Sequence, residues 1–250
     1  MNVLLRGIVG STVYGLSHKD SDVDKLGIYA ASTLDLCTLY PPGEKEYTVV
    51  QNDPDIVLHE AGKFCRLALK GNPSITELLY LEKYDQFSPL GLRLVAMRSS
   101  FLSASSVENA YLGYAIAQFK RLNREGYFQA KYRKRTEKHA RHILRLMDQG
   151  YELFTTGSLT LKVSDPDKYF DFGKKTAKDK SVADLVIEEY KEKFSITKSV
   201  LPELPDVAAV KNWLDEVRRA NFEVRIAGNA TTLRDSDFNH PKRFGMGITS

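Results

Sequence analysis

The sequence predicts an α+β fold, because two kinds of residue pattern follow one another along the chain. Short apolar runs bounded by turn residues, the pattern of strands, occupy roughly the first sixty positions. From about residue 60 onward, apolar residues recur three and four positions apart, the spacing of amphipathic helices. We therefore expect a strand-rich core in residues 1–60, a helical domain in residues 61–221 and an irregular tail in residues 222–250.

Four apolar segments are expected to be the strands of this core. Residues 3–9 and 26–30 are short apolar runs, and two further strands are predicted around Val49-Val50 and at residues 56–58. Residues 40–46 contain two prolines and a glycine, which is typical of a turn. The strands are thus short and closely spaced, as in a small sheet.

The helical part has recognisable start and stop signals. The first predicted helix ends at Gly71, a residue type favoured just after a helix. Ser74 and Glu77 have the spacing of a capping box, in which each would bond to the backbone beside the other. The predicted helices are residues 60–70, a segment that begins at Ser105 or Ser106 and runs through 119, and residues 135–154, 181–194 and 207–220.

Composition excludes several classes of protein. The 250 residues include 42% hydrophobic ones, enough for a core without disulfide bonds. The two cysteines, Cys37 and Cys65, lack the spacing of a zinc site, so a reducing compartment is expected. No apolar run reaches the ~18 residues of a membrane span, and the N-terminus does not resemble a signal peptide. We expect a cytoplasmic protein with no membrane partner.

Positive charge is concentrated in one part of the chain. The net charge is only +4, yet residues 120–145 contain ten basic and two acidic residues, a local charge of +8. Such a cluster favours binding of phosphate groups on a nucleotide or a nucleic acid, although many charged runs are simply solvated helix faces. The basic residues are Lys120, Arg121, Arg124, Lys131, Arg133, Lys134, Arg135, Lys138, Arg141 and Arg145.

The most informative motif is a Gly-Ser turn followed by two aspartates. Gly10-Ser11 ends the first predicted strand, where backbone amides and a hydroxyl could donate to phosphate oxygens. Asp22 and Asp24 begin the second predicted strand, and strand residues two positions apart face the same side. Because magnesium prefers carboxylate and phosphate oxygens, this pattern favours a magnesium site beside a phosphate-binding turn.

A second pattern lies on the predicted helix 135–154. At 100° per residue, Lys138, His142, Arg145 and Gln149 fall within a stripe of ~40°. The stripe could bind a triphosphate or an RNA backbone, and the alternative is a solvated basic face. The opposite, apolar face, which is expected to be buried, consists of Ala140, Ile143, Leu144, Met147, Tyr151 and Phe154.

Together these motifs resemble the nucleotidyltransferases of the DNA polymerase β superfamily, which share a Gly-Ser turn, a spacer of about ten residues and an Asp-x-Asp pair. The chain is most similar to a bacterial and phage family of predicted nucleotidyltransferases, some of them linked to RNA repair. The resemblance covers roughly residues 3–160. It rests on Gly10-Ser11, Tyr14-Gly15-Leu16, Ser21-Asp22-Val23-Asp24, Lys70-Gly71-Asn72-Pro73, Glu77-Leu78-Leu79, Leu112-Gly113-Tyr114, and Lys138 with His142 and Arg145-Leu146.

The resemblance implies a small mixed-sheet nucleotidyltransferase core, with the helical domain completing a nucleotide cleft. It implies two Mg²⁺ ions, with Mn²⁺ as a possible substitute, on Asp22 and Asp24. A third metal-binding and catalytic carboxylate would come from a neighbouring strand. Asp55 is the first choice for it, Glu60 the second and Asp53 the third, and His59 shares a strand face with Asp55.

The resemblance further implies an NTP substrate, with ATP among the candidates, bound by Gly10, Ser11, Lys138, His142 and Arg145. The expected reaction moves an NMP to an acceptor hydroxyl, most readily at an RNA end such as that of a tRNA, and releases pyrophosphate. Protein nucleotidylation of the AMPylation type and a non-catalytic nucleic-acid-binding role are the alternatives. RNA contact is assigned to Arg121, Arg124, Arg133, Lys134 and Arg135.

Overall fold

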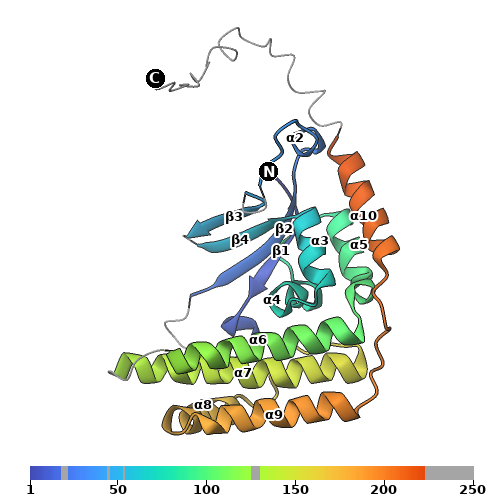
Figure 1. The fold of residues 1–250 in the computed structure, drawn as a ribbon. Helices are drawn as coiled ribbons and strands as arrows, with labels where there is room; N and C mark the ends of the chain where they lie inside the picture. The colour runs from blue at the N-terminus through green and yellow to red at the C-terminus, as the bar shows by residue number, and fades with distance from the viewer. Residues whose placement is uncertain (18–21, 44–45, 53, 125–129, 223–250) are drawn as a thin grey trace, which may run out of the picture.

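The computed structural model describes residues 1–17, 22–43, 46–52, 54–124 and 130–222 (Figure 1). It has a five-stranded sheet in the order β3-β4-β2-β1-β5, in which β2 and β4 are parallel and the other neighbours antiparallel. The predicted α+β class with a mixed sheet is confirmed. The strands are β1 (Asn2–Val9), β2 (Asp24–Ala30), β3 (Thr48–Asn52), β4 (Asp55–Glu60) and the short edge strand β5 (Gln86–Phe87).

Helices make up most of the remaining described chain. All five helices predicted from the sequence are present, and three of them, α3, α9 and α10, keep their predicted boundaries to within two residues. The helices are α1 (Ser11–Tyr14), α2 (Thr33–Leu36), α3 (Ala61–Leu69), α4 (Pro73–Thr76), α5 (Pro89–Ala96), α6 (Ala104–Arg124), α7 (Ala130–Thr156), α8 (Pro166–Lys178), α9 (Ser181–Ile196) and α10 (Val207–Ala220), with the 3-10 helices η1 (Glu77–Tyr80) and η2 (Arg98–Phe101).

Two helix starts differ from the prediction. Helix α6 begins after Ser103, whose hydroxyl accepts a hydrogen bond from the Ser106 backbone at 3.3 Å, so neither Ser105 nor Ser106 is the cap. The capping box predicted at Ser74 and Glu77 is wrong. The Asn72 side chain accepts from the Ser74 backbone at 3.1 Å and caps α4 instead, which leaves the Glu77 side chain available for another role.

Two of the longer helices, α5 and α8, were not predicted, although each has a start signal. In α5, the Ser88 hydroxyl accepts from the Gly91 backbone and a proline occupies the first turn. In α8, the Asp165 carboxylate accepts from the Lys168 backbone, again before a proline. A capping residue followed by proline is a recognised helix start and would have located both. The tail predicted to be irregular lies, beyond residue 222, outside the described residues.

The elements form layers around one continuous cluster of buried apolar side chains. Helices α3, α5 and α10 lie beside the sheet, whereas α6 and α7 cross one end of it and pack on α8 and α9 (Figure 1). The buried cluster extends from Ile28 in the sheet through Met147 in α7 to Trp213 in α10. The face of α7 predicted to be apolar is in contact with this cluster. Within the described residues, no helix is long and apolar enough to span a membrane.

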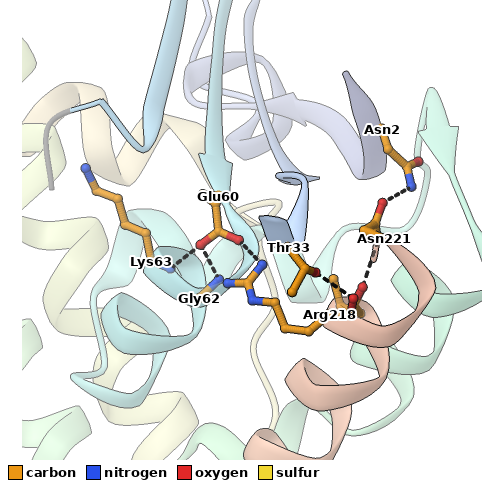
Figure 2. A network of polar contacts seen from close by, with 8 residues as sticks. Asn2, Thr33, Glu60, Gly62, Lys63, Arg218 and Asn221 are labelled. Carbon is orange, nitrogen blue, oxygen red and sulfur yellow. Dashed lines mark hydrogen bonds and ion pairs between the residues drawn. The ribbon is translucent and has the colours of Figure 1, made fainter. Parts of the chain in front are cut away.

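The C-terminal helix α10 returns to the N-terminal part of the chain through polar contacts (Figure 2). The Glu60 carboxylate, whose side chain is 3% exposed, accepts from the Gly62 backbone at 2.7 Å and pairs with Arg218 of α10. Nearby, the Asn2 amide donates to Asn221 at 2.9 Å, and the Thr33 hydroxyl donates to the Arg218 carbonyl at 2.6 Å. These contacts attach the C-terminal end of α10 to the start of β1, to the end of β4 and to the starts of α2 and α3.

Arg218→Ala should lower the free energy of unfolding by about 3 kcal/mol, because it leaves a buried carboxylate without its cation. Urea unfolding measures the loss. Arg93→Ala is the matched control, since it also breaks an ion pair to α10, with Glu216, but one that is exposed to solvent. Equal losses in the two variants would show that burial of Glu60 does not matter.

Candidate active site

A cavity of about 940 Å³ lies between the sheet and the two long helices α6 and α7. Its floor is the end of β1 together with the starts of β2 and β4, and its opposite wall comes from the facing sides of α6 and α7. Nearly all the described site residues predicted from the sequence line it, although they come from positions more than 130 residues apart. They are Gly10, Ser11, Asp22, Asp24, Asp55, Lys138, His142 and Arg145.

The Gly-Ser turn is shaped by a backbone conformation that favours glycine. Gly10 has φ +76°, and its carbonyl accepts hydrogen bonds from Val13 and Tyr14, which close the short helix α1. A Cβ atom at Gly10 would lie 2.7 Å from Oδ2 of Asp24. Glycine therefore allows the turn to approach the Asp24 carboxylate closely.

Two carboxylates are brought together by the parallel pairing of β2 and β4. Lys25 pairs with Ile56 in the register, which places Asp24 and Asp55, the first residues of their strands, next to each other. Burial raises the pKa of Asp24, and the negative charges of Asp55 and Asp22 raise it further, whereas Lys138 lowers it. The carboxylates are thus close enough to repel one another, and a bound cation would relieve that repulsion.

These carboxylates fit the donor set of a magnesium site. Among the described residues, no three His, Cys, Asp or Glu side chains form a ready-made metal-binding group. Magnesium usually takes only one or two carboxylates, together with water and substrate phosphates. Asp24 and Asp55 can provide the carboxylates, and the adjacent turn at Ser11 leaves room in the cavity for phosphates.

Of the other two candidates for the third carboxylate, the structure describes only Glu60, which is not at this place. Glu60 lies at the opposite end of β4, where its carboxylate caps α3 and pairs with Arg218. Asp53 lies outside the described residues. His59 does line the cavity, but its Nδ1 is 2.9 Å from the Thr48 hydroxyl, and burial followed by the Lys63 charge lowers its pKa to about 4. His59 is therefore neutral near pH 7.

The basic stripe of α7 lines the cavity with one exposed and two largely buried side chains. Lys138 is exposed. Burial and the charge of Arg145 lower the pKa of His142 to about 3, so its imidazole is neutral. Arg145 is only 3% exposed, and its guanidinium bonds to Gln149 and lies 2.9 Å from Nδ1 of His142. The stripe thus combines one accessible cation with a buried, hydrogen-bonded one.

Of the remaining basic residues, two line the cavity and three others are exposed on α7. Arg121 and Arg141 line the cavity itself, while Arg133 and Lys134 are exposed on the N-terminal turns of α7. Arg135 is exposed as well. The predicted RNA-contact residue Arg124 and the basic residue Lys131 have side chains outside the described part of the structure.

The sequence reasoning missed Glu77 as a residue of the cavity. Its side chain is 5% exposed, lines the cavity wall and accepts a hydrogen bond from the Tyr14 hydroxyl. Burial raises the pKa of Glu77 to about 7, against the lowering influence of Arg145 and of the Tyr14 hydrogen bond. The apparent capping box concealed this role, because the spacing from Ser74 had a simpler local explanation.

A comparison with protein-family models finds one match, described as "RlaP: RNA repair pathway DNA polymerase beta family", over residues 1–184. That range contains the whole sheet, the cavity and helices α1 to α8, whereas α10 lies beyond it. No curated protein matches the chain with significance.

Proposed function

Because the chain belongs to the RNA repair pathway DNA polymerase beta family, we propose that it is a metal-dependent nucleotidyltransferase that moves an NMP from an NTP to an acceptor hydroxyl. The family is of the DNA polymerase β type and is linked to RNA repair. The observation that carries the proposal is the juxtaposition of Asp24 and Asp55 at the starts of two parallel strands, directly beside the Gly10 turn.

The carboxylates have two tasks in this proposal. Nucleotidyltransferases of this superfamily typically use divalent metals, and Asp22, Asp24 and Asp55 would hold two Mg²⁺ ions here, for which Mn²⁺ can substitute. When bound, the ions supply positive charge that stabilises the attacking and leaving oxygens. Asp55 accepts the proton of the acceptor hydroxyl. The acceptor oxygen then forms a bond to the α-phosphorus, and the bond from that phosphorus to pyrophosphate breaks.

The phosphates of the NTP are bound from two sides. The Ser11 hydroxyl and the backbone of the Gly10 turn donate hydrogen bonds from the sheet side. Lys138, exposed on the facing helix, contributes a mobile cation, and Arg145 contributes a fixed one deeper in the cavity. His142, being neutral, acts as a hydrogen-bonding partner and orients Arg145.

An RNA end is the acceptor that the surface charge favours. Arg133 and Lys134 are exposed on the same helix as Lys138, so a polyanion bound along α7 would lead to the cavity opening. The family's link to RNA repair supports the same choice. A protein hydroxyl is the competing acceptor, and a non-catalytic nucleic-acid-binding role would use the same basic surface without the carboxylates.

Labelled transfer from each NTP, with magnesium, tests the proposal on the full chain. Total RNA and the protein itself are offered as acceptors, and mass spectrometry locates the added nucleotide. We expect an added NMP on an RNA end, dependent on magnesium. If the label is found on protein alone, the acceptor is a protein hydroxyl and not an RNA end. RNA binding without any transfer would favour the non-catalytic role.

The basic residues of α7 should separate into two groups in a pair of titrations. Arg145→Ala should raise the KM for NTP and leave RNA affinity almost unchanged, because Arg145 is buried in the cavity. Arg133→Ala should leave the KM for NTP constant and reduce the salt slope of RNA binding by about one unit for each phosphate that the variant no longer neutralises. A weakening of RNA binding alone in Arg145→Ala would make α7 solely an RNA-docking surface.

A further inference from the structure

A buried carboxylate lies against the helix that follows the Gly-Ser turn. Glu77 accepts a hydrogen bond from the hydroxyl of Tyr14, the last residue of α1, and both side chains are buried. Helix α1 has only four residues and begins at Ser11. The position of the Ser11 hydroxyl therefore depends on how the single turn that ends at Tyr14 is held.

Tyr14 is held from its ring face as well as from its hydroxyl. The guanidinium carbon of Arg145 lies 3.8 Å from the centre of the Tyr14 ring. The Gln149 amide, which bonds to Arg145, donates to the carbonyls of Thr160 and Leu161 at 3.0 and 3.1 Å. A chain of polar contacts thus connects α1 to α7 and to the loop that follows α7.

The backbone of α1 is bonded to the same loop. The Val163 amide donates to the Tyr14 carbonyl at 3.1 Å. The loop thus holds the backbone of α1 at Tyr14, whereas the hydrogen bond to Glu77 holds the hydroxyl end of the Tyr14 side chain. With both in place, the turn is pre-organised before any ligand binds.

Neither of the simpler roles accounts for Glu77. It does not cap α4, because Asn72 does. Fold stability does not explain it either, because burying a carboxylate costs free energy, as the raised pKa of Glu77 reflects. What the carboxylate does supply is a directional acceptor for the Tyr14 hydroxyl, beside the wall of the cavity.

We propose that Glu77 is a positioning residue for phosphate binding: through the Tyr14 hydroxyl it holds α1 so that the Ser11 hydroxyl faces the phosphates of the substrate. The inference rests on the proposed function, because it takes the Gly10-Ser11 turn to be the phosphate-binding element. Glu77 itself touches no substrate in this arrangement. Its contribution is transmitted by Tyr14 to Ser11.

Binding of inorganic tripolyphosphate with magnesium, measured by calorimetry on the full chain, tests the inference without knowledge of the base or acceptor. Tyr14→Phe should weaken this binding about tenfold, the factor for one hydrogen bond involving a charged group. Glu77→Ala should weaken it as much. Glu77→Gln, which keeps an acceptor for the Tyr14 hydroxyl, should restore most of the affinity.

A double-mutant cycle identifies the route of the effect. If Tyr14 acts through Ser11, the Tyr14→Phe change should cost less than about twofold when Ser11 is already alanine. Tyr190→Phe is the matched control, because it also removes a tyrosine hydroxyl that donates to a carboxylate, Asp148, but outside the cavity. It should leave tripolyphosphate binding unchanged. Thermal unfolding of every variant separates loss of fold from loss of binding.

The outcomes distinguish this inference from the proposed function. If the wild type binds tripolyphosphate, and Ser11→Ala weakens this binding while Tyr14→Phe does not, only the positioning role is overturned. A full tenfold effect of Tyr14→Phe in the Ser11→Ala background would also overturn it, because the effect would not pass through Ser11. Absence of tripolyphosphate binding by the wild type would overturn the phosphate-binding turn, and the positioning role with it.

Discussion

Asp24→Asn should reduce nucleotidyl transfer by about a thousandfold or more, while the protein stays folded. Asp24 lies at the centre of the candidate site, since it is next to Asp55 in the parallel register and closely approaches the Gly10 turn. Metal clamping supplies several kcal/mol of transition-state stabilisation, and a factor of a thousand corresponds to about 4 kcal/mol. Single-turnover rates at saturating NTP and magnesium measure the loss.

The unfolding midpoint of Asp24→Asn should not fall. Burial and the charges of Asp55 and Asp22 raise the pKa of Asp24, so the native state already disfavours the ionised form in the absence of metal. Asp171→Asn, a change of the same type in an exposed ion pair with Lys174 on α8, is the control and should transfer at the wild-type rate. Near-normal transfer by Asp24→Asn would show that the metal site is elsewhere.

Gly10→Ala should reduce transfer by about a hundredfold. An alanine at φ +76° is strained, and its Cβ would lie 2.7 Å from Oδ2 of Asp24, so either the turn or the carboxylate must move. A displacement of about 1 Å at a reacting centre is enough for a loss of this size. The measurement is kcat/KM for NTP, together with the unfolding midpoint.

A glycine in α6 provides the control for this substitution. A Cβ at Gly113 would meet no atom within 4 Å, and alanine favours a helix by about 1 kcal/mol over glycine. Gly113→Ala should therefore keep full activity and unfold at a slightly higher temperature. Wild-type activity in Gly10→Ala would mean that the close approach of the turn to Asp24 has no part in the reaction.

The sequence by itself determined the parts of this protein that depend on local pattern. Four of the five strands, β1 to β4, follow from short apolar runs, and the buried face of α7 follows from helical periodicity, since both patterns repeat within a few residues. The short edge strand β5 was not predicted. The Gly10-Ser11 turn and the Asp22-Asp24 pair were also found from local pattern. Their spacing is local enough to be read without knowing what packs against them.

Only the tertiary structure decided how distant residues act on these motifs. It placed Asp55 rather than Glu60 beside Asp24, because the register between β2 and β4 cannot be read from either strand alone. It also left His142 neutral and gave Glu77 its contact with Tyr14, although the sequence pattern favoured a phosphate contact for the first and a helix cap for the second. Burial and hydrogen-bond partners set these properties, and both arise from segments that meet only when the chain folds.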